Sequence, residues 1–304
     1  MTANIIFMGS PEFAVPTLKH LAEQYHISGV VTQPDRPAGR GRVLTPPPVK
    51  LAALSLGIEV IQPERLRSPE AFEILESWKP DLIIVAAYGQ ILRQVVLDLP
   101  HFGCLNVHAS LLPRWRGAAP IQAALLNGAE KTGVSIMKMD AGIDTGSVLA
   151  QEDLQIDPQD NALTLGQRLA LKGADLLIKT LPAYLSGLIT PMQQDNSLSS
   201  YAKMLKKEEG LLNFTSPAWV LVNKIRAFYP WPGAYTIWNN DILKIHKAGV
   251  FQENTLIGAR KIINGYPAIG TGDGWLILDE VQPAGKKAMA GKIFLQGARN
   301  WSGS

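Results

Sequence analysis

Short apolar runs separated by helical patterns in the first half of the chain constrain the fold more than any other feature. Runs that are apolar at almost every position are typical of strands covered on both faces, as in a parallel sheet between helices. Their alternation with helical patterns predicts a doubly wound α/β fold with a mostly parallel, Rossmann-like sheet. The apolar runs are residues 4–8, 27–31, 58–61 and 81–87, and the helical patterns are residues 13–21, 69–78 and 165–185.

The second part of the chain has a different pattern. Residues 188–209 are polar and irregular, which indicates a linker. A helical pattern over 217–228 follows, and then short alternating segments separated by turn pairs such as Asn264-Gly265. About five short strands of this kind predict a small β-barrel. We therefore expect one domain over residues 1–189, a linker over 190–208 and a second domain over 209–304.

Charge is distributed unevenly along the chain. Residues 1–205 contain 17 Lys and Arg against 19 Asp and Glu, whereas residues 206–304 contain 12 against 7. A basic C-terminal part joined to a nearly neutral N-terminal part indicates a module that binds a polyanion. The same lysines would also simply keep a domain soluble, so charge alone does not identify nucleic acid as the partner.

Three features favour a cytoplasmic location. No stretch approaches the roughly 18 apolar residues that a membrane span needs. The first residues lack the basic and apolar regions of a signal peptide. The single cysteine, Cys104, cannot form an internal disulfide, as expected in a reducing compartment. We therefore expect a cytoplasmic protein, and we also expect a monomer.

The turn after the first apolar run, Gly9-Ser10-Pro11, lies where a dinucleotide-binding fold carries its phosphate loop. Such a loop has the pattern G-x-G-x-x-G, because backbone amides must approach a pyrophosphate closely. Only the first glycine is present, and Pro11 removes one amide. The sequence therefore argues against a nicotinamide or flavin oxidoreductase.

A candidate for chemistry is the short run at residues 104–108, which reads Cys-Leu-Asn-Val-His. In a strand, Asn106 and His108 lie on one face about 6.6 Å apart, so their side chains can hold one small polarised group. Cys104 lies about 13 Å from His108, too far for a nucleophilic pair, and we interpret it as a core residue. A hydrogen-bonded histidine at a strand end would give the same pattern. However, ligands bind at the carboxyl ends of strands in open α/β sheets.

Residues 139–146 form a glycine-rich loop with two carboxylates, Asp140 and Asp144. Asp is common in turns because it bonds its own backbone, so a structural role explains either residue taken alone. Spacing does not decide which of the two faces His108. No cluster of His, Cys and carboxylates has the spacing of metal ligands, and we expect no metal.

Residues 33–48 contain three arginines within seven positions, Arg36, Arg40 and Arg42, between several prolines. We expect neither strand nor helix in this segment, because it is stiff and polar. One interpretation is an ordinary solvated loop. The other is a flap that binds phosphates through guanidinium groups.

Several segments resemble the folate-dependent formyltransferase family. Residues 106–117 and 139–146 match the two catalytic segments of that family, and residues 32–41 match the insertion loop that marks its tRNA-directed members. Residues 201–210 and 228–234 resemble the linker and the entry to the second domain. The resemblance covers essentially the whole chain, and it implies that the C-terminal barrel is an OB-type domain that binds tRNA.

The resemblance also implies roles for individual residues. Asn106, His108 and Asp144, rather than Asp140, correspond to the catalytic residues. The formyl donor would be 10-formyltetrahydrofolate, a co-substrate. The expected donor-binding residues are Ser110, Leu111, Leu112 and Pro113, together with Tyr88, Gly89, Gln90, Ile91 and Leu92 around the pterin. The expected tRNA contacts are Arg36, Arg40, Arg42, Lys206 and Lys207.

The activity that the resemblance implies is direct formyl transfer to the free α-amine of methionyl initiator tRNA. Asn106 and His108 would stabilise a tetrahedral oxyanion, while Asp144 would orient His108 and help to remove the ammonium proton. One alternative is a relative that formylates a sugar-nucleotide or purine-precursor amine, and the arginine-rich loop argues against it. Another is a tRNA-binding protein without activity, which would leave these three residues without a use.

Overall fold

The structure, a computed structural model, describes residues 3–38, 41, 43–298 and 300–302. Its contacts separate two compact units, both of them discontinuous in sequence. Unit 1 comprises Met1–Gly117, Lys131–Gln155 and Gly166–Tyr201, and unit 2 comprises Ala118–Glu130, Ile156–Leu165 and Ala202–Ser304. The domain boundaries expected at residues 189 and 209 stay a prediction.

Unit 1 is built on a seven-stranded sheet with the strand order β10-β9-β7-β6-β1-β2-β5. The five strands from β7 to β5 are parallel to their neighbours, whereas β9 is antiparallel to both β7 and β10. This arrangement confirms the predicted doubly wound, mostly parallel sheet. The strands are β1 (Asn4–Gly9), β2 (His26–Val31), β5 (Val60–Ile61), β6 (Leu82–Ala86), β7 (Cys104–His108), β9 (Lys131–Lys138) and β10 (Val148–Gln155).

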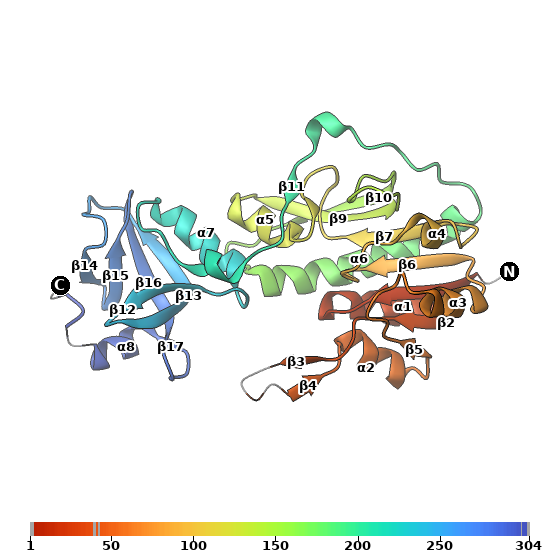
Figure 1. The fold of residues 1–304 in the computed structure, drawn as a ribbon. Coiled ribbons are helices and arrows are strands. Elements are labelled where there is room, and N and C mark those ends of the chain that lie inside the picture. Colours follow the sequence, from red (N-terminus) through yellow and green to blue (C-terminus); the bar gives the residue numbers. More distant parts are fainter. Residues whose placement is uncertain (1–2, 39–40, 42, 299, 303–304) are drawn as a thin grey trace. The chain divides into compact units, whose positions relative to one another are not determined.

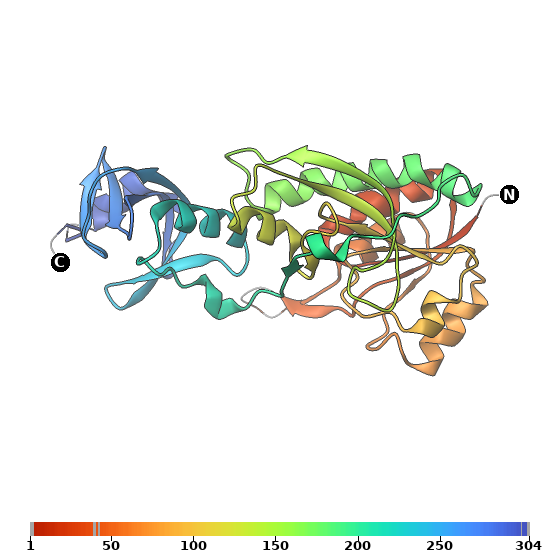
Figure 2. The same ribbon diagram turned by 90° about the horizontal axis from the view of Figure 1, so that it is seen from above.

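Helices cover both faces of this sheet, which explains why its central strands are apolar at every position (Figure 1). One face carries a cluster that includes Ile6 and Met8 of β1 and Leu75 of α3. In the view from above, α1 and α6 run along one side of the sheet, with α3 and α4 on the other (Figure 2). The helices are α1 (Val15–Gln24), after the 3-10 turn η1 (Glu12–Ala14), α2 (Pro48–Ser55), α3 (Pro69–Ser77), α4 (Gln94–Leu97) and α6 (Ala162–Leu185).

The turn after β1 is a packing turn. A Cβ at Gly9 would lie 2.8 Å from the Ala14 Cβ and 2.9 Å from the Ala86 carbonyl oxygen, so only glycine fits between η1 and β6. The Ser10 hydroxyl, next in the chain, donates to the Tyr88 carbonyl oxygen at 3.3 Å. This glycine therefore brings the chain close to its neighbours inside the protein.

The expectation of neither strand nor helix over residues 33–48 was wrong. Strands β3 (Arg36–Ala38) and β4 (Val43–Thr45) form an antiparallel hairpin, in which Pro37 lies opposite Leu44, and α2 begins at Pro48. Both strands of a two-stranded ribbon are edges, where a proline without an N–H is tolerated. Because the ribbon needs no core, the polar composition that argued against a strand does not exclude it.

Unit 2 contains an antiparallel sheet with the order β12-β13-β16-β15-β14, and β17 pairs with β16. This confirms the predicted small β domain, although β13 with 11 residues and β16 with 9 are longer than the short strands expected. Its core includes Leu221 and Ile225 of α7, Leu276 of β16 and Trp301. The elements are β12 (Ala234–Trp238), β13 (Asp241–Phe251), β14 (Arg260–Ile263), β15 (Tyr266–Gly270), β16 (Trp275–Pro283), β17 (Met289–Ala290), α5 (Pro120–Leu126), α7 (Ala218–Phe228) and α8 (Gly291–Gly297).

The stretch expected as a linker contains short regular elements and hydrogen-bonded turns. They are the 3-10 turns η2 (Asn196–Leu198) and η3 (Lys207–Gly210) and strand β11 (Tyr201–Ala202), which pairs with β8 (Arg116–Gly117). Among the helices of the described residues, none is long and apolar enough to cross a membrane.

Candidate active site

The site lies where β7 ends. Asn106 and His108 are 9% and 5% exposed and share one face of this strand, as the alternation predicted. Residues opposite them on β9 are Met137 and Ser135, so both polar side chains lie within a well-formed sheet. Buried polar groups must find hydrogen-bond partners, and the chain supplies these partners from the segment after β7 and from the loop between β9 and β10.

The loop between β9 and β10 brings a carboxylate to this strand end. The Asp144 Oδ2 atom lies 3.7 Å from the His108 Nδ1 atom, and the Asp144 Oδ1 atom accepts from the Asn106 Nδ2 atom at 3.4 Å. The backbone N–H of Gly117 donates to Oδ2 at 2.8 Å. Asp144 has a φ of 52°, a left-handed conformation that costs energy in a residue other than glycine. The fold therefore holds one carboxylate against both predicted side chains.

The second aspartate of this loop has a different role. Asp140 Oδ1 accepts from the backbone N–H of Gly142 at 3.0 Å and from the Thr145 hydroxyl at 2.7 Å. These bonds close the turn on itself, as Asp commonly does in loops. Asp140 thus shapes the loop, while Asp144 faces the histidine, a distinction that spacing alone did not make.

The imidazole of His108 lies between two hydrogen-bond acceptors. Its Nε2 atom lies 3.1 Å from the Trp115 carbonyl oxygen, and its Nδ1 atom faces the Asp144 carboxylate. A carbonyl and a carboxylate both accept hydrogen bonds, so each ring nitrogen of His108 faces an acceptor. Trp115 itself has a φ of 61°, so a second strained residue lies beside the histidine.

A buried guanidinium from the segment after β7 supports the same loop. Arg116, only 2% exposed, donates from its Nε and Nη2 atoms to the Gln194 Oε1 atom at 3.0 and 2.8 Å. Nη2 also donates to Asn196 Oδ1 at 2.8 Å. Nearby, the Ser200 hydroxyl accepts from the Trp115 N–H at 3.0 Å. These partners come from the polar stretch after α6, and no motif or spacing could have found them.

Cys104 is a core residue, as predicted. It is 1% exposed, and burial raises the pKa of its thiol to about 12. A thiol with this pKa is protonated at neutral pH and is not a nucleophile. Across the described residues, no group of three or more His, Cys, Asp or Glu side chains is arranged to hold a metal ion.

Comparison with known proteins identifies the family. The sequence pattern described as formyl transferase matches residues 3–181, and that of the formyl transferase C-terminal domain matches residues 204–299. The chain belongs to the formyl transferase family. It is 49% identical to the methionyl-tRNA formyltransferase of Bacillus pumilus, over 97% of this chain and 95% of that relative. It is 47% identical to that of Chloroflexus aggregans, over 97% of both chains.

Solved formyltransferases share the fold of this formyl transferase at low sequence identity. The sugar 3N-formyl transferase WlaRD, solved in the presence of dTDP and 5-N-formyl-THF, has a TM-score of 0.69 at 21% identity, covering 94% of this chain and 100% of its own. The methionyl-tRNA formyltransferase from Clostridium thermocellum has a TM-score of 0.55 at 18% identity, covering 81% and 93%. Both structures support the fold, with its parallel sheet and second β domain.

In this formyl transferase, hydrogen bonds hold the segment predicted to lie along the folate, residues 110–113. Ser110 is fully buried and donates to the Arg114 carbonyl oxygen at 2.6 Å, so its hydroxyl shapes the turn. The Ser135 hydroxyl accepts from the Leu112 N–H at 3.1 Å, and Gln151 donates to the Leu112 carbonyl oxygen at 2.8 Å. Leu112 is buried, while Leu111 and Pro113 are partly exposed. Ser135 and Gln151 are supporting residues that sequence reasoning missed.

The segment predicted around the pterin places most of its side chains inside the protein. Tyr88 is 2% exposed, its hydroxyl has no partner among the described residues, and burial raises its pKa. Gln90 bonds the backbone at Leu66 and Pro63, and Leu92 is buried. Gly89 is exposed and has a φ of 86°. The parts of this segment open to a ligand are therefore the Gly89 backbone and the side chain of Ile91, which is 82% exposed.

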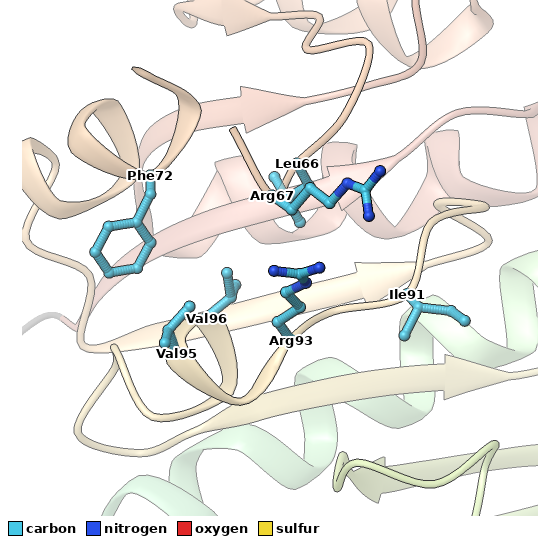
Figure 3. A pocket seen from close by; sticks show the side chains of 7 residues that line it. All are labelled: Leu66, Arg67, Phe72, Ile91, Arg93, Val95 and Val96. Carbon is cyan, nitrogen blue, oxygen red and sulfur yellow. The ribbon is translucent and has the colours of Figure 1, made fainter. Parts of the chain in front are cut away.

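Beside this segment lies a small pocket of about 60 Å³ that two arginines line (Figure 3). Arg67 precedes α3 and Arg93 precedes α4, and Ile91 from the predicted pterin segment lines the same pocket. Neither guanidinium has an ion pair or hydrogen bond with any residue that the structure describes. The remaining lining residues are apolar: Leu66, Phe72, Val95 and Val96.

The structure describes some of the residues predicted to contact tRNA and leaves others outside the described range. The Arg36 side chain is 64% exposed, and its Nη2 atom lies 3.4 Å from the Glu64 Oε2 atom. Arg40 and Arg42 lie outside the described residues. Lys206 and Lys207 are exposed at the start of η3. These described cations are thus accessible to a large polyanionic partner.

Proposed function

We propose that this formyl transferase moves the formyl group of 10-formyltetrahydrofolate to the free α-amine of methionyl initiator tRNA. The product is formylmethionyl-tRNA, the aminoacyl-tRNA that starts translation. The observation that carries the proposal is the convergence of Asn106, His108 and Asp144 at the carboxyl end of β7. The 49% identity to a methionyl-tRNA formyltransferase along nearly the whole chain supports the choice of acceptor.

In the proposed reaction the amine attacks the formyl carbon, and a C–N bond forms as the carbonyl oxygen becomes an oxyanion. The Asn106 amide and the His108 ring donate hydrogen bonds to this oxygen, with the ring exchanging its bond to Trp115 for one to the substrate. Such donors typically contribute about 2.7–4 kcal/mol each to transition-state stabilisation.

The carboxylate of Asp144 completes the step. It accepts the proton that the amine nitrogen must lose once it has become an ammonium in the tetrahedral intermediate. That proton then passes to the folate nitrogen as its bond to the formyl carbon breaks. The proton count therefore balances, and tetrahydrofolate leaves without a covalent intermediate on the enzyme. Because the carboxylate accepts from the Gly117 N–H, it is oriented before the substrate arrives.

The donor's binding site is proposed along Ser110–Pro113 and Tyr88–Leu92, with its anionic end at the arginine pocket. Folates end in a glutamate with two carboxylates, and guanidinium groups bind carboxylates through paired hydrogen bonds. Arg67 and Arg93 line the pocket next to Ile91 and are without counter-ions among the described residues. The aromatic end of the donor would then extend toward the backbone at Gly89.

The proposed tRNA contacts come from the arginine-rich hairpin and from the basic C-terminal part, with Lys206 and Lys207 at its start. Phosphate contacts of this kind position a nucleic acid without reading its bases. We further propose that the protein acts as a monomer in the cytoplasm, where aminoacyl-tRNA is made and where the Cys104 thiol stays reduced.

Transfer assays with matched acceptors test the function. The protein is incubated with 10-formyltetrahydrofolate and with methionyl initiator tRNA, free methionine or an amino sugar nucleotide. We expect formylation of the tRNA-linked amine only. Efficient transfer to the amino sugar nucleotide, with none to methionyl-tRNA, would overturn the proposal and favour a small-molecule acceptor.

A further inference from the structure

One side chain outside the catalytic trio uses its whole hydrogen-bonding capacity to join two parts of the site. The Gln194 Oε1 atom accepts two hydrogen bonds from Arg116, and its Nε2 atom donates to the backbone carbonyl oxygens of Asp144 and Gly146 at 2.9 and 2.7 Å. A guanidinium only donates and a carbonyl only accepts, so the orientation of this amide is fixed. All four residues belong to unit 1.

These bonds close a ring around the carboxylate. Arg116 precedes Gly117, whose N–H donates to Asp144 Oδ2. Gln194 accepts from Arg116 and donates to the Asp144 carbonyl oxygen, which closes the ring. The side chain and the main chain of Asp144 are therefore tied to the same strand, β8, by separate bonds. This ring of hydrogen bonds holds Asp144, whose left-handed φ of 52° is unfavourable without support from its neighbours.

The end of the loop that follows Asp144 packs tightly against β9. A Cβ at Gly146 would lie only 1.8 Å from the Lys138 carbonyl oxygen, so the backbone already packs tightly against the end of β9. Gln194 donates to the carbonyl of this same glycine. Loss of the Gln194 side chain would leave these two backbone carbonyl oxygens without this donor and the buried Arg116 guanidinium with Asn196 alone, and the loop would move to satisfy them.

We propose that Gln194 is a positioning residue for formyl transfer, which sets the distance between the Asp144 carboxylate and His108. The proposal rests on the function given above. Gln194 comes from the polar stretch after α6, about 50 positions from Asp144 in the chain. This stretch therefore contributes to the geometry of the active site and does more than join two domains.

Gln194 uses both its amide oxygen, which accepts from Arg116, and its amide nitrogen, which donates to the loop carbonyls. A glutamate at this position keeps the acceptor and loses the donor, so this variant is informative. In Gln194→Glu, the new carboxylate would pair with Arg116 and keep that buried charge compensated. It would also face the Asp144 and Gly146 carbonyl oxygens, and two acceptors repel. A purely structural role for Gln194 would be preserved by this change, whereas a positioning role would be lost.

The experiment compares full-length Gln194→Ala and Gln194→Glu with Gln193→Ala. Gln193 is the exposed neighbour of the same type, and its side chain makes no hydrogen bond to any residue the structure describes. For each variant we would measure kcat, both KM values, the thermal unfolding midpoint and hydrogen–deuterium exchange over residues 138–148.

We expect kcat to fall by up to about 100-fold in both Gln194 variants, because a misplacement of about 1 Å costs that much. Both KM values should stay within about threefold, and Gln194→Glu should unfold close to the wild-type temperature. Exchange over residues 138–148 should rise in both Gln194 variants, while Gln193→Ala should match the wild type throughout.

Three results separate the possibilities. Wild-type kcat in Gln194→Glu would overturn the positioning role, and so would unchanged exchange over residues 138–148 in both Gln194 variants. A wild-type protein that transfers no formyl group to methionyl-tRNA would instead overturn the proposed function. The exchange measurement needs no acceptor and still decides whether Gln194 holds the Asp144 loop.

Discussion

At the scale of single residues, two aspartates four positions apart divide the work of one loop. Asp140 bonds Gly142 and Thr145 and closes the turn, whereas Asp144 faces His108 and Asn106. Residue type and local sequence are nearly the same for both. Their different surroundings therefore assign them different chemistry.

Replacement of Asp144 by Asn should abolish most of the activity. The variant keeps the size of the side chain but loses the charge that faces His108 and the proton acceptor for the amine. We expect kcat to fall by about 100- to 10,000-fold, the usual contribution of a general base, with folding intact. Single-turnover transfer to methionyl-tRNA measures this loss.

Asp140→Asn is the matched control. Its amide oxygen can still accept from Gly142 and Thr145, so the turn should form and activity should stay within about threefold of wild type. Equal losses in the two variants would mean that loop shape, and not the Asp144 carboxylate, limits the reaction.

Cys104→Ala should be active. The thiol is buried against the Val96 carbonyl oxygen and is protonated at neutral pH, so it takes no part in transfer. We expect unchanged kcat and a loss of about 1 kcal/mol in unfolding free energy from the small cavity. Urea denaturation and transfer assays check both values, and loss of transfer by a folded variant would contradict this interpretation.

At the scale of secondary-structure elements, the chain places its functional groups at or near the ends of helices and strands. Asn106 and His108 lie within the last three residues of β7, Arg93 directly precedes α4, and Arg67 lies two residues before α3. Rigid elements therefore fix the backbone positions of these residues, and the loops fix the orientation of their side chains. The β3–β4 hairpin shows the limit of composition, because a ribbon with two edges accepts a proline that a core strand would exclude.

The arginine pocket leads to a prediction at this scale. The double variant Arg67→Gln/Arg93→Gln should raise KM for 10-formyltetrahydrofolate by about 10-fold or more, because charge-assisted bonds to carboxylates are lost. The kcat value should change little, since neither residue reaches the formyl group. Steady-state kinetics with the donor varied measures the effect.

Arg65→Gln serves as its control, because Arg65 is exposed in the same segment but does not line the pocket. We expect its KM for the donor to match the wild type. If the double variant also keeps a wild-type KM, the anionic end of the donor does not bind in this pocket.

At the scale of the whole molecule, charge is separated between the two parts of the chain. The surplus of cations lies in residues 206–304, while residues 1–205 are nearly balanced. A protein that contacts several tRNA phosphates releases counter-ions, so its affinity falls steeply with salt. KM for methionyl-tRNA should rise by about 10-fold or more between 50 and 200 mM salt, whereas KM for the donor should change far less.

The slope of this salt dependence can be assigned to residues. Lys206→Ala/Lys207→Ala should reduce the slope by about two if each lysine contacts one phosphate. Lys19→Ala/Lys179→Ala removes two exposed lysines of unit 1 and should leave the slope unchanged. The same slope in both double variants would exclude Lys206 and Lys207 from the tRNA contacts.

The sequence by itself determined the sheet, its helical cover and the strand that carries Asn106 and His108. These features follow from local periodicity, because apolar runs and helical spacing record which faces are buried. The same periodicity places residues two apart on one face of a strand, so this pair could be predicted without a structure.

Only the tertiary structure decided which further groups meet that pair. Asp144 joins it across 38 positions to Asn106, and Gln194 joins Asp144 across 50. Loop residues have no period, and the direction of their side chains depends on bonds to distant segments such as β8. For that reason the resemblance to a family could name Asp144, but neither pattern nor motif indicated Gln194.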